Sequence, residues 1–286
     1  SDGYKIEFKS SIGKKNLESV TAKGVIFSGG VVGTVPLLLK LKEKSLLNLS
    51  DCVGKNIRTN NESLLVVTST YKHPKDYSKG LAIGSILHTD ENSHLEPVRY
   101  GEGSSFFRML TMPLVYHKYT LFRILGIFGL ALKNPVKLFK TIFAKNYTKR
   151  TTVLLFMQTL DSTLRIKLGK ITKMKTVQED GPKPKAFIPE ALSFGKMFGE
   201  KVKGILYANF TDVLLGTPTT AHILGGAVMG MNASEGVLDK HCNVFGYKNM
   251  LVCDGSMISA NPGVNPSLSI TAISEYAMSK IPNKKS

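Results

Sequence analysis

The sequence has few cysteines and no long apolar run. Its three cysteines (Cys52, Cys242 and Cys253) are odd in number and far apart, so they fit neither a disulfide framework nor a C-x-x-C metal or redox pair. This usage favours a reducing compartment. A membrane-spanning helix needs roughly 20 uninterrupted apolar residues. The closest stretch, residues 121–132, is short and contains Arg123, which favours a cytoplasmic or peripheral membrane location.

Several catalytic signatures are missing as well. The sequence has no G-x-x-x-x-G-K-[ST] run, which excludes a P-loop enzyme, and no close His/Cys cluster, so we expect no metal site. A serine hydrolase would have to combine Ser256, His222 and Asp254. However, there is no G-x-S-x-G elbow, and Asp254 is too near Ser256 to act as the usual orienting acid. The sequence therefore argues against a serine hydrolase.

Acidic residues are scarce: 21 of them stand against 38 lysines and arginines, for a formal net charge of +17. Such a charge attracts nucleic acids, anionic membranes or acidic ligands over long distances. Because the lysines are scattered rather than gathered in a motif, we expect no nucleic-acid partner. A solvated lysine-rich surface and attraction to a membrane surface both remain open. With 286 residues, 42% of them hydrophobic, the chain can bury a large core in one or two joined domains.

The sequence begins without a methionine or a signal peptide. Residues 4–9 alternate between polar and apolar side chains, which predicts a strand that pairs with residues 18–23 as a hairpin. A strand so close to the first residue suggests the C-terminal part of a longer protein.

A compact apolar run at 24–28 predicts a strand buried on both faces. It is followed by the glycine-rich turn GGVVGT (29–34) and by a predicted helix over 35–44. A strand, glycine turn and helix in this order bring backbone N–H groups close to a phosphate or a ribose. The spacing is not G-x-G-x-x-G, however, so the glycines could instead serve only close strand-to-helix packing.

The middle of the chain predicts mainly strands, at 64–68, 81–88 and 94–100, with a hairpin that joins 153–157 to 164–168. A helix is predicted over 188–201, with Pro189 in its first turn. Residues 136–143 place apolar side chains on one helical face and lysines on the other. This face either packs on the protein itself or lies at a lipid interface or over an apolar substrate entrance.

Three short elements near the C-terminus carry the candidate chemistry: AHILGG (221–226), VCDGS (252–256) and GVNPSLSI (263–270). Oxidation of an alcohol needs a base for the hydroxyl proton, a donor that holds the oxygen and an acceptor for the hydride. Histidine suits the first two roles, which makes His222 a candidate. Asn265 and Pro266 precede an apolar helix predicted to reach Met278. Asn265 could simply cap this helix, or the helix N-terminus could stabilise a developing negative charge.

In this order and with these gaps, the three elements resemble the C-terminal signature of the glucose-methanol-choline (GMC) oxidoreductases, and most of all its cholesterol oxidase-like branch. The resemblance covers nearly the whole chain and includes the glycine turn at 29–34. It implies an α/β protein with a Rossmann-like FAD-binding lobe (1–61 and 211–286) and a sheet-based substrate-binding lobe (62–210). The family's N-terminal G-x-G-x-x-G unit is not in this sequence, so we expect the chain alone to bind FAD weakly.

The resemblance also implies roles for individual residues. His222 and Asn265 would lie at the substrate hydroxyl beside the flavin, and Glu96 matches an active-site glutamate of cholesterol oxidases. A buried glutamate there could act as a base and move a double bond, whereas a solvated glutamate at a strand end would do neither. The residues implied to approach FAD are Gly29, Gly30, Gly33, Asp254, Gly255, Asn265 and Pro266.

The implied activity is oxidation of an apolar secondary alcohol, with hydride transfer to the flavin and O2 or another molecule as the final electron acceptor. Because the resembled branch acts on sterols, the implied substrate class is a sterol. The alternative is a non-catalytic protein that keeps the GMC fold and binds an apolar ligand or a membrane surface. The positive charge and the apolar segments within 121–143 motivate this alternative.

Overall fold

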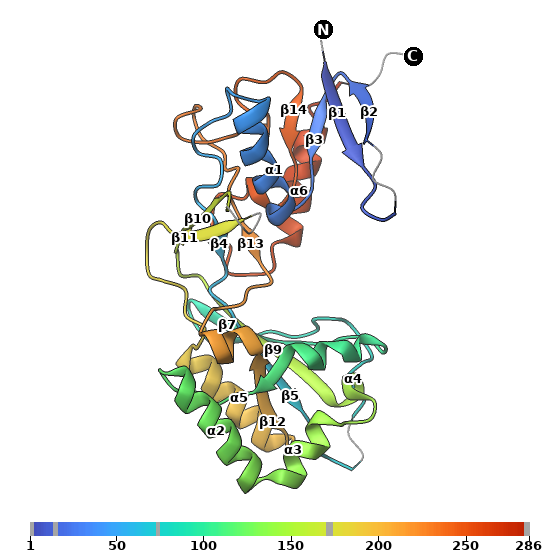
Figure 1. The fold of residues 1–286 in the computed structure, drawn as a ribbon, viewed down its shortest axis with the longest axis vertical. Coiled ribbons are helices and arrows are strands. Elements are labelled where there is room, and N and C mark those ends of the chain that lie inside the picture. Colours follow the sequence, from blue (N-terminus) through green and yellow to red (C-terminus); the bar gives the residue numbers. More distant parts are fainter. Residues whose placement is uncertain (1–2, 14–16, 73–74, 170–173, 283–286) are drawn as a thin grey trace. The chain divides into compact units, whose positions relative to one another are not determined.

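The computed structural model describes residues 3–13, 17–72, 75–169 and 174–282. The chain divides into two compact units (Figure 1). Unit 1 comprises residues 1–59, 161–181 and 222–286, and unit 2 comprises 60–160 and 182–221. The first boundary lies two residues from the predicted one. The segment 161–181, predicted in the substrate lobe, belongs to unit 1, and 211–221, predicted in the FAD lobe, belongs to unit 2.

In the part of unit 1 that the structure describes, there are four two-stranded sheets and two long helices. A hairpin of β1 (Tyr4–Lys9) and β2 (Leu17–Ala22) confirms the first predicted pairing. The remaining elements are β3 (Val25–Phe27) parallel to β14 (Met250–Val252), β4 (Arg58–Thr59) antiparallel to β13 (Ile223–Leu224), β10 (Leu164–Lys167) antiparallel to β11 (Lys175–Gln178), the helices α1 (Val31–Lys44) and α6 (Ser267–Met278), and the 3-10 turn η3 (Gly255–Met257).

One apolar cluster joins the elements of unit 1 that carry the C-terminal signature. Leu38 of α1, Leu224 of β13, Val252 of β14, Met257 of η3 and Ala277 of α6 are all buried in it. Full burial of a leucine, valine or methionine side chain stabilises a core by about 1.5–3 kcal/mol. The three sequence elements are therefore held on a common core although they lie far apart in the chain.

The predicted burial of residues 24–28 on both faces is wrong. Ile26, at the middle of β3, is 44% exposed, and its two neighbours are half-buried. Among the described residues, β3 pairs with β14 alone, so a neighbouring strand lies at only one of its two edges.

The predicted hairpin of 153–157 with 164–168 is also wrong. The strand β9 (Thr151–Gln158) pairs with strands of unit 2, whereas Leu164 exchanges two backbone hydrogen bonds of 2.8 Å with Ile57 in unit 1. Ile166 packs with Val31 and Val35 of α1. Because β9 is buried along almost its whole length, neighbours on both sides satisfy its backbone better than one hairpin partner would.

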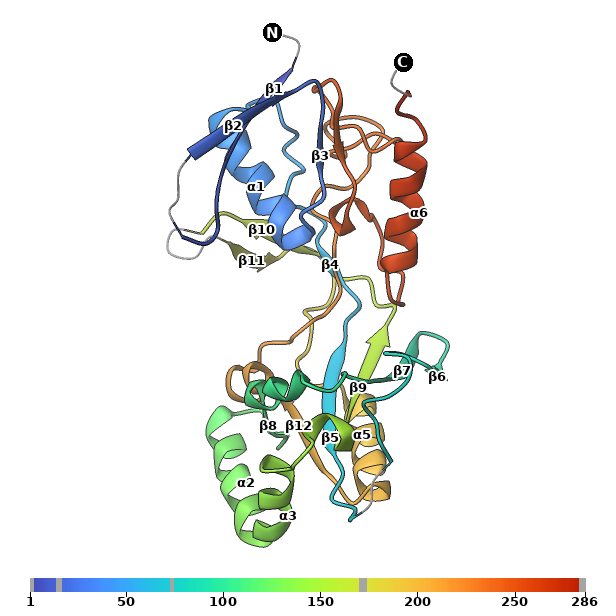
Figure 2. The ribbon, with the colours of Figure 1, turned by 90° about the vertical axis from the view of Figure 1, so that its right-hand side faces the viewer.

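Unit 2 is built on a six-stranded antiparallel sheet with the order β6-β7-β9-β5-β12-β8 (Figure 2). Its other strands are β5 (Ser63–Thr68), β6 (Leu87–Asp90), β7 (Ser93–Val98), β8 (Thr111–Pro113) and β12 (Ile205–Asn209). The predicted strand at 81–88 is largely irregular, since only its end forms β6. Ile83, within the irregular part, forms an isolated antiparallel bridge with Val98.

The two faces of this sheet are covered by different helices. On one face, Leu65 and Phe156 pack with Ala191 of α5 (Pro189–Lys201), which begins with a proline as predicted. On the other face, Val66, Val153 and Tyr207 contact Leu130 of α2 (Thr120–Lys133) and Leu138 of α3 (Pro135–Ile142). Shorter helical turns complete the unit: η1 (Ser104–Leu110), α4 (Tyr147–Arg150) and the π-helical turn η2 (Thr211–Leu215). No helix in the described ranges is long and apolar enough to cross a bilayer.

Candidate active site

The turn after β14 is held by the carboxylate of Asp254. Its Oδ1 accepts hydrogen bonds from the backbone N–H (2.8 Å) and the hydroxyl (2.5 Å) of Ser256. Its Oδ2 accepts from the hydroxyl of Thr34 on α1 at 2.5 Å, and that hydroxyl oxygen in turn accepts from the N–H of Gly29 at 3.1 Å. The buried Asp254 side chain thus links the glycine turn at 29–34 to η3 through protein contacts.

The three C-terminal elements meet around Gly255. Its carbonyl oxygen accepts a hydrogen bond of 3.0 Å from the N–H of Gly225, three residues after His222. A Cβ atom placed on Gly255 would lie 3.4 Å from the carbonyl oxygen of Ile223 and 3.5 Å from Cδ1 of Ile270 in the first turns of α6. The segments that carry His222, Asp254 and Asn265 are therefore neighbours in unit 1.

The glycine pair that follows His222 is required by close packing. Gly225 has φ +81°, and a Cβ there would lie 2.0 Å from the carbonyl oxygen of Asn56. A Cβ on Gly226 would lie 2.6 Å from side-chain atoms of Ile57 and Val35. Larger residues would push this strand away from α1, so the pattern His-Ile-Leu-Gly-Gly has a packing reason in addition to any chemistry.

His222 and Asn265 are both half-buried. The helix α6 ends at Met278 as predicted, but it begins at Ser267, with Pro266 rather than Asn265 in the capping position and without a side-chain capping bond. Its first turn contains no acidic residue. The partial positive charge of the helix N-terminus lies directly after Asn265 as a result.

The glycine turn after β3 fits a group that carries phosphate or ribose. The helix α1 begins at Val31, four residues earlier than predicted, so Gly33 lies in its first turn. Gly30 has φ +68°, and a Cβ on Gly30 or Gly33 would meet no atom within 4 Å. This bare backbone borders open space at a helix N-terminus with no acidic residue in its first turn, which suits an anionic group. Gly29 differs, because its Cβ would already contact Thr34.

Glu96 lies in unit 2 and is 4% exposed, so the solvated alternative is wrong. It stands within the strand β7, and its Oε1 lies 3.5 Å from Nε2 of His94. Burial lowers the pKa of His94, with a smaller opposing contribution from Glu96. His94 is not among the site residues predicted from the sequence. The i, i+2 spacing of the two residues in a predicted strand, which places them on one face, is the signal that could have found it.

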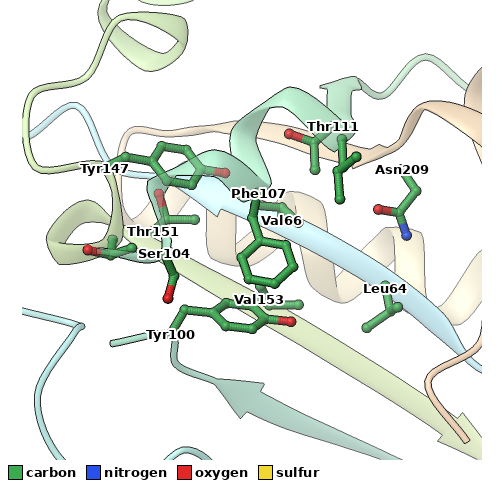
Figure 3. A pocket seen from close by; sticks show the side chains of 12 residues that line it. Leu64, Val66, Tyr100, Ser104, Phe107, Thr111, Tyr147, Thr151, Val153 and Asn209 are labelled. Carbon is green, nitrogen blue, oxygen red and sulfur yellow. The ribbon is translucent and has the colours of Figure 1, made fainter. Parts of the chain in front are cut away.

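Figure 3 shows a small apolar pocket on the sheet of unit 2, and the strand register places Glu96 on the same sheet face. In the register of the sheet, Glu96 is opposite Leu155, and Leu155 is opposite Leu64 of the pocket wall. Strand spacing puts Glu96 about 10 Å from Leu64 along this row. The Tyr100 and Phe107 rings, with centroids 4.4 Å apart, form another part of the wall.

The pocket has a volume of about 60 Å³ and lies next to a second cavity of about 260 Å³. Thr111 and Tyr147 line both. Ligand pockets of proteins commonly enclose about 300–1,000 Å³, so a ligand of sterol size would need both cavities. The second one also contains the buried phenol of Tyr207, whose pKa burial raises to about 12. The combined lining is mainly apolar, with several hydroxyl groups, the amide of Asn209 and the guanidinium of Arg108.

Two buried carboxyl groups of unit 2 were not predicted. Glu62 accepts hydrogen bonds from the hydroxyl of Thr220 and from the N–H of Ala221, the residue that precedes His222. Asp212 of η2 accepts a hydrogen bond of 2.6 Å from the hydroxyl of Thr219. Neither carries a local sequence signal, because burial of a lone acidic residue depends on the packing of distant segments. Among the described residues, no group of three or more His, Cys, Asp or Glu side chains could hold a metal ion.

Replacement of Asp212 by asparagine is expected to stabilise the protein above about pH 6. Burial raises the pKa of Asp212 to about 6, and hydrogen bonds from Thr219 and Thr211 offset part of this effect. An unfolded aspartate has a pKa of about 3.9, so the native state binds the proton more tightly, and stability falls as the pH rises from about 4 to 6. Asp212→Asn should raise the free energy of unfolding by about 1–2 kcal/mol at neutral pH.

Urea unfolding of both proteins at about pH 4.5 and about pH 7.5 measures this effect. The advantage of the variant should grow with pH. A constant difference between the two proteins would contradict the assigned titration.

Residues 200–274 match the family model of the GMC oxidoreductases. The C-terminal part of the chain is therefore that of a GMC oxidoreductase, a family of flavoproteins, which confirms the resemblance that the sequence pattern predicted.

Within this family, the chain is similar to cholesterol oxidases. It is 36% identical over 290 residues to a cholesterol oxidase of Acinetobacter baumannii, a match that covers 99% of this chain and 52% of the relative. It is 33% identical over 282 residues to a cholesterol oxidase of Mycobacterium tuberculosis, with 95% and 48% covered. The chain spans about half the length of the curated relatives it matches. A crystal structure of pyridoxine 4-oxidase from Mesorbium loti shares the fold, with a TM-score of 0.51 at 14% identity over 94% of this chain and 53% of that one.

Proposed function

We propose that this protein takes part in FAD-dependent oxidation of the CH–OH group of an apolar alcohol, with a sterol as the preferred substrate class. The observation that carries the proposal is the convergence of the His222, Asp254 and Asn265 segments at Gly255, next to a glycine turn that borders open space. The similarity to cholesterol oxidases supports the substrate class. The chain is also 27% identical to a long-chain-alcohol oxidase of Arabidopsis thaliana, over 94% of this chain and 37% of the relative. The name of that relative likewise specifies an apolar alcohol.

Different residues of this chain would bind the cofactor, accept the proton and stabilise the developing charge. The bare backbone at Gly30 and Gly33 would hold FAD, which supplies the hydride acceptor when bound. His222 takes the proton of the substrate hydroxyl, and Asn265 holds the hydroxyl oxygen. The N-terminus of α6, directly after Asn265, stabilises negative charge that develops near it. Molecular oxygen or another molecule accepts the electrons in the end.

The apolar part of the substrate would lie on the sheet of unit 2. The two cavities there offer apolar walls and hydroxyl groups, on the sheet face that also carries Glu96. A buried carboxylate next to His94 can accept a proton from an activated carbon, so Glu96 would move the double bond of a sterol ketone. Oxidation would then be followed by isomerisation.

Replacement of Glu96 by glutamine separates these two reactions. In the full native polypeptide supplied with FAD and a sterol, Glu96→Gln should slow formation of the conjugated ketone by about 10²-fold or more, because an amide cannot accept the proton. Oxidation itself should slow by about 10-fold or less. Ultraviolet absorbance of the conjugated product and consumption of the electron acceptor measure the two rates. Glu91→Gln, the same change at the exposed turn of the β6–β7 hairpin, should alter neither rate. If Glu96→Gln slowed both reactions equally, the role assigned to Glu96 would be removed.

The activity is tested directly by anaerobic bleaching of the flavin. The full native polypeptide, mixed with FAD, should show a visible flavin absorbance that a sterol removes faster than choline, a sugar or a long-chain alcohol does. The alternative, a non-catalytic binding protein, is favoured by the exposed apolar face of α2. A protein that stays colourless after FAD is added but binds a sterol would support this alternative and contradict oxidation.

A further inference from the structure

The helix α2 exposes most of its large apolar side chains and buries an arginine. Its large apolar side chains at 121, 122, 125, 128 and 132 are exposed, with Phe128 at 65% and Leu132 at 84%. The side chain of α2 that is fully buried is Arg123, at 4%. A helix that packs only on its own protein buries its apolar stripe and exposes its charges. In α2, Ile127 and Leu130 pack on the protein, but the larger apolar stripe is exposed and the arginine is buried.

The contacts of Arg123 fix this orientation. Its guanidinium group donates to the carbonyl oxygen of His117 at 2.9 Å and to the hydroxyl of Thr120 at 2.7 Å. That hydroxyl donates in turn to the carbonyl oxygen of Leu214 at 3.0 Å. On the same side, Gly126 lets α2 approach Val115 so closely that a Cβ would lie 2.5 Å from it. The helix cannot rotate its apolar stripe inward without breaking these buried contacts.

The apolar surface continues on α3, which packs beside α2 (Figure 2). Leu138 and Thr141 point toward the sheet, whereas Val136, Phe139 and Phe143 are exposed. The rings of Phe139 and Phe143 have centroids 4.7 Å apart. We call the exposed residues together the α2–α3 face; it consists of Leu121, Phe122, Leu125, Phe128, Leu132, Val136, Phe139 and Phe143.

The charges around this face have one sign. The sequence contains no acidic residue between Glu102 and Asp161. Lys133, Lys137 and Lys140 accompany the two helices, and none of them forms an ion pair within the described ranges. An apolar face with phenylalanines and leucines, bordered by lysines alone, has the chemistry of a helix that lies in the interface of an anionic bilayer.

We propose that the α2–α3 face docks the protein on the surface of an anionic lipid membrane. The apolar side chains enter the boundary between headgroups and acyl chains, and the lysines contact anionic headgroups. The helices are 14 and 8 residues long, so they lie along the surface. The cavity of about 260 Å³ in unit 2 is lined by Thr141 and Ile142 of the same helix α3. If the proposed oxidation holds, docking would place this cavity close to a membrane-dissolved alcohol, and that consequence alone rests on the proposed function.

Vesicle sedimentation tests the docking with matched variants of the full native polypeptide. The wild-type protein should bind vesicles that contain phosphatidylserine at least about 10-fold more tightly than vesicles of phosphatidylcholine alone. Phe128→Asp should weaken binding to the anionic vesicles by about 10-fold or more, because it brings a charge into the apolar face. Met197→Asp makes a similar change at an exposed position of α5, on the opposite face of the sheet, and should leave binding within about 2-fold.

The charge contribution is tested in the same way. Lys140→Glu should weaken binding to phosphatidylserine vesicles several-fold, by about 5-fold or more, whereas Lys196→Glu on α5 should not. Absence of wild-type binding, or equal losses for Phe128→Asp and Met197→Asp, would overturn the proposal. It would also be overturned if Phe128→Asp converted a dimer to a monomer in light scattering and left vesicle binding unchanged, because a second copy would then cover the face. Neither FAD nor an alcohol is needed, so failure here leaves the oxidation proposal standing.

Discussion

Replacement of His222 by alanine should slow oxidation of the alcohol by about 10²-fold or more in the full native polypeptide supplied with FAD. The variant lacks the base that takes the hydroxyl proton, and no other described residue of the 221–226 segment can supply one. The flavin should remain bound, since the residues proposed to hold it, Gly30 and Gly33, lie in the glycine turn at 29–34 and not in the 221–226 segment. The measurement is the rate of anaerobic flavin bleaching by a sterol, together with the absorbance of bound flavin after gel filtration.

Asn265→Ala should produce a loss of similar size, because the substrate oxygen would lose its hydrogen-bond donor. His241→Ala provides the matched control. This histidine is also half-buried in unit 1, and its ring bonds the hydroxyl of Tyr276 at 2.8 Å, so its loss should leave the rate nearly unchanged. Undiminished rates in both the His222 and the Asn265 variants would remove the roles proposed for them.

Replacement of Asp254 by alanine should lower the free energy of unfolding by about 3 kcal/mol. The change removes a buried carboxylate that accepts three hydrogen bonds. The N–H of Ser256 and the hydroxyls of Ser256 and Thr34 then lose this acceptor. Asp254→Asn should cost less, because its amide oxygen can still accept from Ser256. Urea unfolding followed by circular dichroism measures the difference.

Asp51 provides the control for this experiment. Its carboxylate is exposed and paired with Lys42, so Asp51→Ala should hardly change the stability. If the Asp254 and Asp51 variants were equally stable, the carboxylate of Asp254 would not hold the turn. Retention of flavin by a destabilised Asp254→Ala protein would further show that this side chain acts on the fold rather than on the cofactor.

Local patterns predicted much of the secondary structure. The period-2 alternation at 4–9 predicted β1, Pro189 predicted the start of α5, and the apolar run before Met278 predicted the end of α6. These features depend on propensities and turn chemistry of neighbouring residues, which a sequence displays directly. At 81–88 only the last residues form a strand, whereas the failure at 153–168 concerns pairing with distant strands. An apolar strand with two possible partners does not indicate which one it will choose.

The candidate site was predictable to different degrees in its different parts. The spacing of His222, Asp254 and Asn265 pointed to the family that the comparison confirmed. In contrast, nothing near Asp254 in the chain shows that its carboxylate bonds Thr34 at a separation of 220 residues. The inward arginine and outward phenylalanines of α2 were likewise invisible, because an amphipathic pattern shows two faces but not which one the rest of the protein covers.

By itself, the sequence determined the order and local form of most elements, the family, and the residue types available for alcohol oxidation, since these depend on short spacings and side-chain chemistry. Only the tertiary structure decided that Glu96 is buried beside His94, that residues 161–181 pack in unit 1, and that α2 presents its apolar stripe outward. Burial and long-range pairing are collective properties of segments far apart in the chain, so they become visible only when the whole fold is assembled.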